Sequence, residues 1–122
     1  MATILLIEDS ESQRLYIKAM LNSLGFSVVE AGDGEQAIKL FRKNPTDLVL
    51  TDIFMPQKEG LSTIMELKEI SPGLKIIAMS SGSRALPDAL EMAADFGADV
   101  CIEKPLEVSV LSDNLTRLLH TD

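Results

Sequence analysis

Acidic side chains end two of the apolar stretches in this sequence. The apolar run at positions 48–50 is typical of a buried strand, yet the stretch ends at Asp52. Glu8 and Asp9 end an earlier apolar run in the same way. An unpaired buried carboxylate costs free energy, so an acid at such a place is either a capped structural residue or part of a functional site.

Two later apolar runs end in other chemically useful groups. One ends in the hydroxyls of Ser80 and Ser81, and the other ends in the ammonium of Lys104 before Pro105. Each of these residues alone has an ordinary explanation as a turn, a cap or a solvated surface side chain. They indicate a site only if the fold brings them together.

Alternating patterns predict the elements that would position these groups. Five apolar runs alternate with segments of helical periodicity. The runs cover residues 3–8, 26–31, 47–52, 74–80 and 99–104. Strand–helix alternation with continuous apolar strands predicts an α/β fold with a parallel sheet covered on both faces. Right-handed crossovers then give a doubly wound open sheet or, less favoured at this length, half of a barrel.

Two of these elements have more specific signals. The run 26–31 mixes polar and apolar residues, as an edge strand does. Before the first helical segment, Ser10 and Gln13 have the spacing of a capping box, and Gly25 is a stop signal. The side chains predicted to face inward on this helix are Leu15, Ala19, Met20 and Leu24.

The carboxyl ends of the strands are the predicted place of the chemistry, because ligands of doubly wound sheets bind there. Three carboxylates, the hydroxyl of Ser80 and the ammonium of Lys104 would meet on one rim. Two carboxylates about 4 Å apart repel by roughly 4 kcal/mol at an effective dielectric constant of about 20, so stability alone would not gather three. A divalent cation removes the conflict, and hard oxygen ligands with open positions suit Mg²⁺.

Composition excludes several other classes of protein. The 122 residues fit a single domain over residues 1–122, and the net charge of −8 at pH 7 argues against a nucleic-acid surface. No apolar run approaches ~20 residues, and the N-terminus lacks the basic region of a signal peptide. Cys101 is the only cysteine, so no internal disulfide forms and a cytoplasmic location is expected.

Four stretches of the chain together resemble the signature stretches of a known family, the receiver domain of two-component response regulators. They are LLIEDS, LVLTDIFMPQKEG, IIAMSSG and CIEKP. The resemblance covers the whole chain, in the same order and with each stretch at a strand end. It implies a flavodoxin-like fold with a five-stranded parallel sheet of order 2-1-3-4-5 and five helices.

The resemblance also implies the acceptor and a metal site. Asp52 matches the phosphoacceptor, whose carboxylate oxygen takes a phosphoryl group from a histidine kinase or phosphotransfer protein to give an aspartyl phosphate. Asp9 would bind Mg²⁺ directly, and Glu8 directly or through water. Asp52 and the backbone carbonyl of Phe54 would complete the protein ligands of the metal.

Three further residues match positions that hold the phosphoryl group in the family. Lys104 would pair with the phosphoryl oxygens, the Ser80 hydroxyl would move to donate a hydrogen bond to them, and the Ser81 backbone N–H would help to hold them. A cis peptide is implied before Pro105. The chain would therefore catalyse only its own phosphorylation and dephosphorylation, and would switch a face that binds a downstream protein or an output domain.

Some positions depart from the commoner family pattern. Cys101 stands where many members have an aromatic switch residue, Phe54 is apolar where several members are polar, and Gly82 leaves the opposite rim position open. Switching is then expected to depend on Lys104, on Ser80 and on ordering of residues 81 to 87 with a shift of the fourth helix.

Three alternatives to a phosphoaccepting module fit the residues less well. An unphosphorylated receiver-like binding module would have lost at least one of the matched site residues. A haloacid dehalogenase-type phosphatase needs an Asp-x-Asp motif after the first strand, whereas Asp52 follows the third and Phe54 occupies the second Asp position. A flavodoxin-like FMN carrier needs a Ser/Thr/Gly-rich phosphate loop, whereas this chain has the acidic EDSES.

Overall fold

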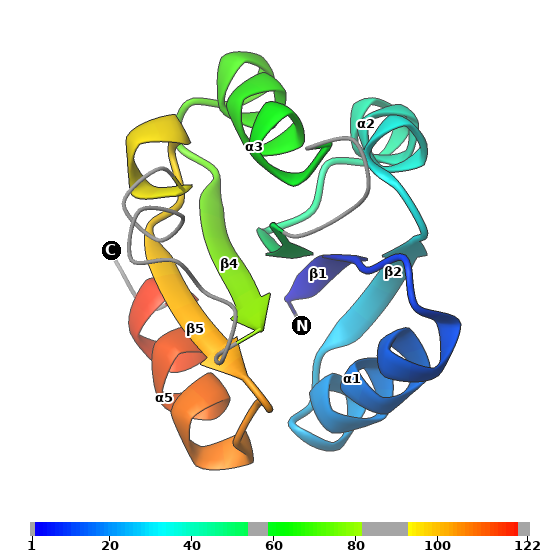
Figure 1. The fold of residues 1–122 in the computed structure, drawn as a ribbon, viewed down its shortest axis with the longest axis vertical. Helices are drawn as coiled ribbons and strands as arrows, with labels where there is room; N and C mark the ends of the chain where they lie inside the picture. The colour runs from blue at the N-terminus through cyan, green and yellow to red at the C-terminus, as the bar shows by residue number, and fades with distance from the viewer. Residues whose placement is uncertain (1, 54–58, 82–92, 120–122) are drawn as a thin grey trace.

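The fold is a parallel sheet between two layers of helices. The computed structural model describes residues 2–53, 59–81 and 93–119. Its strands are β1 (Thr3–Ile7), β2 (Ser27–Ala31), β3 (Leu48–Asp52), β4 (Lys75–Ser81) and β5 (Val100–Lys104). They pair in parallel in the order β2-β1-β3-β4-β5, which confirms the predicted doubly wound sheet and its edge strand β2 (Figure 1).

Helices cover both faces of this sheet (Figure 1). They are α1 (Glu11–Ser23), α2 (Gly34–Lys43), α3 (Glu59–Ile70) and α5 (Val108–Leu119), and residues 93–96 are also helical. The α1 and α5 helices pack on one face, and α2 and α3 pack on the other. None of the helices within the described ranges is both long and apolar enough to cross a lipid bilayer.

The continuous apolar runs of the central strands follow from this layering, because side chains alternate between two buried faces. Leu5 and Val49 belong to the core beneath α2 and α3. Their neighbours Leu6 and Leu50 belong to the core beneath α1 and α5. The four side chains are fully buried, so β1 and β3 each carry apolar residues at consecutive positions.

The α1 helix begins as predicted, but its buried face was predicted correctly only in part. Met20 is buried and Leu24 packs partly buried against the core, as predicted. Ser10 is the N-cap, and its hydroxyl accepts a hydrogen bond from the backbone N–H of Gln13 at 3.4 Å. Leu15 is 55% exposed and Ala19 is also exposed, whereas the buried residues are Ile17, Met20 and Leu21. Because successive helical residues turn by about 100°, Leu15 and Ala19 lie on the side opposite to the buried one.

Candidate functional site

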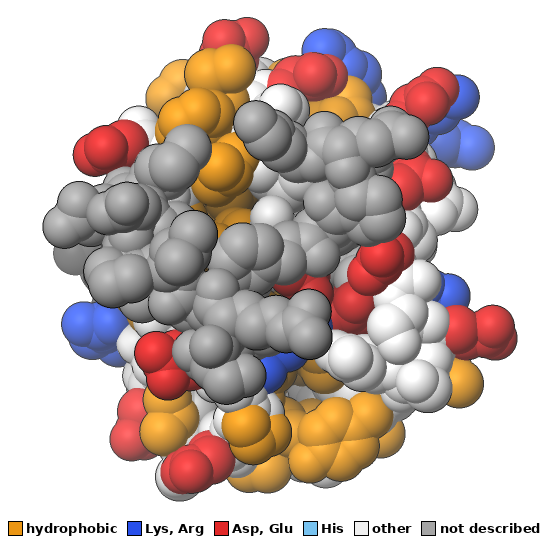
Figure 2. Space-filling view, in the orientation of Figure 1, with side chains coloured by type: hydrophobic (Ala, Val, Ile, Leu, Met, Phe, Trp, Pro, Cys, Tyr) orange, Lys and Arg blue, Asp and Glu red, His pale blue; other side chains and the backbone are white. Residues whose placement is uncertain are grey.

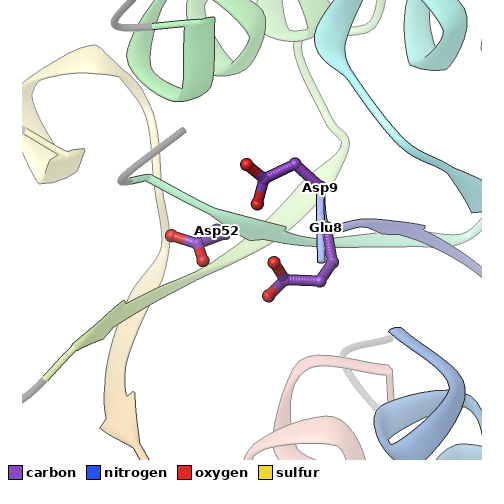
Figure 3. Close-up of side chains that lie close together, drawn as sticks. All are labelled: Glu8, Asp9 and Asp52. Carbon is purple, nitrogen blue, oxygen red and sulfur yellow. The ribbon is translucent and has the colours of Figure 1, made fainter. Parts of the chain in front are cut away.

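Three carboxylates converge at the carboxyl ends of β1 and β3. Glu8 and Asp9 follow β1, and Asp52 is the last residue of β3. One oxygen of each carboxylate lies within 4.8 Å of the others, and the three groups face one another in Figure 3. The pairing of β1 with β3 accounts for this approach, since it places Ile7 opposite Thr51. The predicted convergence of these acids is therefore present in the fold.

Glu8 is held by several hydrogen bonds at the end of β1. Its side chain is 1% exposed and its Oε2 accepts a hydrogen bond from the Ser10 backbone N–H at 3.1 Å. Its backbone carbonyl accepts from Arg14 Nη1 at 2.8 Å, and its N–H donates to the Ala31 carbonyl at 3.1 Å. Burial raises the pKa of the Glu8 carboxyl, although the hydrogen bond from Lys104 opposes this effect.

Lys104 bridges the acids from the end of β5. Its ammonium donates hydrogen bonds to Glu8 Oε1 and Asp52 Oδ2, both at 2.6 Å, and to Gln13 Oε1 at 2.7 Å. The Lys104 side chain is 13% exposed. Burial on its own lowers the pKa of this ammonium, but the hydrogen bonds and charges of Asp52 and Glu8 outweigh that effect and raise it. The site therefore contains a charged ammonium at neutral pH.

Ser80 contributes a hydroxyl that lacks a partner among the residues that the structure describes. It is fully buried, and its Oγ makes no hydrogen bond there. In the sheet register Met79 is opposite Asp52, so Ser80 lies one residue further toward the rim. An unsatisfied buried hydroxyl costs about 1–3 kcal/mol, so a group that binds at this rim and accepts a hydrogen bond would relieve the cost.

The other residues predicted from the sequence lie on β4, at or near β5, or outside the described residues. Ser81 ends β4 opposite Lys104 in the register, and the Lys104–Pro105 peptide is cis as predicted. Cys101 is half-buried, and burial raises the pKa of its thiol. Phe54, Gly82 and the rest of the predicted switch segment up to residue 87 lie outside the described ranges, as does most of the predicted fourth helix.

Two residues of the site were missed from the sequence. Gln13 had been assigned only to a helix cap, because its contact with Lys104 joins positions 91 residues apart. Gly60 lies in the first turn of α3, and a Cβ there would lie 2.6 Å from Ile53 Cα and 2.7 Å from the Asp52 carbonyl oxygen. The sequence shows that Gly60 follows Asp52 by eight positions, but it does not show that α3 approaches the end of β3 so closely at this glycine.

The charge of the site suits a divalent cation. Three carboxylates and one ammonium leave a net charge of −2 when all are ionised. Acidic side chains also gather near the middle of the molecular face in Figure 2, and most basic side chains in that view lie nearer its edge. Glu8, Asp9 and Asp52 offer the hard oxygen ligands that Mg²⁺ prefers, and Asp9 is exposed to solvent.

Comparison with known proteins identifies the family of the chain. A sequence model described as the response regulator receiver domain matches residues 4–116. The chain is 36% identical over 120 residues to the autoinducer 1 sensor kinase/phosphatase LuxN of Vibrio campbellii. It is 34% identical over 116 residues to the sensor protein EvgS of Escherichia coli. These matches cover 97% and 95% of this chain but 14% and 10% of the relatives' lengths.

Solved structures agree with this assignment. A response regulator receiver domain protein from Clostridium thermocellum has a TM-score of 0.90 at 27% identity, covering 98% of this chain and 94% of that chain. The signal receiver domain of a histidine kinase from Syntrophus aciditrophicus has a TM-score of 0.87 at 26% identity, covering 100% of this chain and 96% of that chain. The chain belongs to the response regulator receiver domain family, which acts in two-component signalling.

Proposed function

We propose that residues 1–122 form one phosphoaccepting receiver domain in which Asp52 takes a phosphoryl group from a histidine kinase or phosphotransfer protein. The observation that carries the proposal is the position of Asp52. Its carboxylate ends a buried central strand, faces Glu8 and Asp9, and accepts a hydrogen bond from Lys104 at 2.6 Å. A nucleophile on a rigid strand beside a fixed ammonium is arranged for transfer to a charged phosphoryl group.

The transfer step uses groups of this chain. A carboxylate oxygen of Asp52 forms the new bond to phosphorus while the bond from phosphorus to the donor nitrogen breaks, and the electron pair stays on the donor imidazole. Lys104 donates hydrogen bonds to the phosphoryl oxygens. The buried Ser80 hydroxyl supplies a further donor, and the Ser81 backbone N–H assists.

Mg²⁺ is the proposed cofactor. Glu8, Asp9 and Asp52 would hold it, with the carbonyl of Phe54 as a further ligand. Bound there, it would neutralise negative charge that develops on the phosphoryl group. The fit rests on the donor set: three carboxylates with only one ammonium between them leave excess negative charge that a divalent cation would balance.

The proposed role is that of a switch and not of an enzyme with a separate substrate. Phosphorylation and its reversal would occur only on Asp52. The partners would be the phosphodonor protein and either a downstream protein or an output domain. The two relatives named above are a sensor kinase/phosphatase and a sensor protein, which fits a donor of the histidine kinase type in general terms. A cytoplasmic location stays a prediction from the single cysteine.

Intact-mass measurement after incubation with acetyl phosphate and Mg²⁺ tests the proposal. We expect a gain of one phosphoryl group that hydroxylamine removes, and we expect Asp52→Asn to abolish it. Asp33→Asn is the matched control, because Asp33 caps α2 and asparagine caps a helix equally well. A wild-type protein that never gains the group would favour the unphosphorylated binding module, and a fully labelled Asp52→Asn variant would refute the choice of acceptor.

A further inference from the structure

Two glutamines occupy the same position in two helices but make different contacts. Gln13 and Gln36 are each the third residue after the N-cap, Ser10 in α1 and Asp33 in α2. In both helices the N-cap side chain accepts a hydrogen bond from the glutamine backbone N–H. A glutamine at this position usually reaches back to a backbone N–H at the helix start.

Gln36 reaches back to the residue just before its N-cap, whereas Gln13 reaches across to β5. The Gln36 Oε1 atom accepts a hydrogen bond from the Gly32 backbone N–H at 2.9 Å. The Gln13 Oε1 atom accepts from Lys104 Nζ at 2.7 Å. The N-cap N–H that Gln13 would otherwise serve, that of Ser10, donates to Glu8 Oε2 at 3.1 Å. Glu8 therefore takes over part of the cap, and the amide of Gln13 is available to the site.

The Gln13 contact completes the hydrogen bonding of Lys104. An ammonium has three N–H donors, and the three acceptors found here are Glu8, Asp52 and Gln13. Two of these acceptors are carboxylates of the acidic cluster. The third is a neutral amide that belongs to α1 and is not among the acids that would bind a metal.

This difference matters once a cation is bound to the acids. Two positive charges added to the cluster weaken its attraction for Lys104 and also repel the ammonium directly. The attraction of the Gln13 amide does not depend on the charge of the cluster. Of the three acceptors, Gln13 is thus the one whose hold on Lys104 persists when Glu8 and Asp52 become metal ligands.

We propose that Gln13 is a positioning residue that keeps the Lys104 ammonium at the rim beside Asp52 when the carboxylates bind a divalent cation. The consequence for phosphoryl transfer rests on the proposed function. The contact itself does not, so the two ideas can fail separately. Removing the amide should leave metal binding intact while the ammonium becomes less ordered.

Nuclear magnetic resonance of the lysine ammonium groups tests the contact without any phosphodonor. The Lys104 signal is identified by its absence in Lys104→Met. At saturating Mg²⁺ we expect hydrogen exchange of this ammonium to be about fivefold faster in Gln13→Met than in the wild type. Gln36→Met is the matched control and should leave the rate unchanged. Gln13→Glu keeps an oxygen acceptor and should restore slow exchange.

Phosphorylation by acetyl phosphate at saturating Mg²⁺ then tests the consequence. We expect Gln13→Met to lower the second-order rate constant of phosphorylation about fivefold, with the Mg²⁺ dissociation constant changed by less than about twofold. Equal ammonium exchange in Gln13→Met and the wild type would overturn the positioning role. If no variant, the wild type included, accepts a phosphoryl group, the proposed function fails while the exchange measurement still decides the role of Gln13.

Discussion

The acidic ends of β1 and β2 lie side by side but differ in their electrostatics. Glu8, at the end of β1, is 1% exposed, and burial raises the pKa of its carboxyl. Glu30, in β2, has a side chain that is 30% exposed and pairs with Lys18 at 2.9 Å and Arg14 at 3.4 Å. The hydrogen bond from Lys18 is the main reason that the pKa of Glu30 is lowered.

The position of each strand in the sheet explains the difference. β1 lies between β2 and β3, so acids at its end meet the acid at the end of β3. β2 is the edge strand, and its acid has two basic partners within reach. Stability would favour the second arrangement everywhere. The crowded arrangement at β1 therefore indicates function, and paired substitutions at the two places test this contrast.

Removal of the lysine at each place should give the largest difference. Lys104→Met leaves Glu8 and Asp52 buried without their shared cation, and we expect a loss of roughly 3 kcal/mol in the free energy of unfolding. Lys18→Met leaves Glu30 with Arg14 near the surface, and the loss should stay below about 1 kcal/mol. Urea denaturation in metal-free buffer at about pH 7 measures both.

The pH dependence of the Lys104→Met deficit provides a second check. The pKa of Glu8 is raised above its ordinary value of 4.5 in the folded protein, so the folded state binds the proton more tightly than the unfolded state. The stability that protonation of Glu8 provides is then lost as the pH rises from about 4.5 through the raised folded-state pKa. The hydrogen bond from Lys104 opposes this rise, so in Lys104→Met the pKa of Glu8 is raised further and protonation of Glu8 stabilises the variant more than the wild type. The difference in unfolding free energy between the two should therefore shrink toward about pH 5, and a difference that grows on acidification would contradict the assignment.

Alanine at the glycines in the first turns of α3 and α2 should give the next largest difference. A Cβ at Gly60 meets backbone atoms of Asp52 and Ile53 at 2.6 to 2.8 Å, so Gly60→Ala must move the end of β3 or the helix. We expect a loss of about 2 kcal/mol. A Cβ at Gly34 meets chiefly the Thr63 hydroxyl, which can rotate away, so Gly34→Ala should cost less. Thermal unfolding compares them, and equal losses would remove the contrast.

Substitutions of the acids after β1 and after β2 should differ by about tenfold in their effect on the Mg²⁺ dissociation constant. Asp9→Ala removes one of three clustered carboxylates and should weaken Mg²⁺ binding by about that factor. Asp33→Ala removes the N-cap of α2 and should cost about 1 kcal/mol of stability with little effect on the metal. Calorimetric titration gives the affinities. Equal weakening would mean that the cation is a nonspecific counterion to the net charge of −8.

The smallest effect is expected at Glu30. Its pKa is lowered from 4.5, so its pairing adds stability above that pH and loses it as the pH falls through the folded-state value. Glu30→Gln should cost about 0.5 kcal/mol at about pH 7, and the difference should vanish near pH ~3. Glu35→Gln, at a side chain that is 80% exposed, is the matched control. Denaturation across this pH range tests both variants.

Local patterns predicted much of the fold because they report burial and capping directly. Residues 48–52 and 76–80 are buried, so their apolar runs were visible in the sequence, and Ser10 predicted the start of α1. The inward face of α1 was predicted incorrectly at Leu15, since an exposed leucine has the same periodicity as a buried one until the helix is packed. Asp52, Glu8 and Asp9 were predictable because acids at the ends of apolar runs conflict with burial.

The strand–helix alternation, the strand-end acids and the family resemblance can be read from the chain alone, because all of them depend on neighbouring residues. The bridge that Lys104 makes between Glu8 and Asp52, and the contact by which Gln13 completes its hydrogen bonding, exist only in the packed fold. The same is true of the close approach of Gly60 to the end of β3. These contacts join residues that local propensity cannot relate, because their geometry exists only after sheet order and helix packing bring the strand ends together.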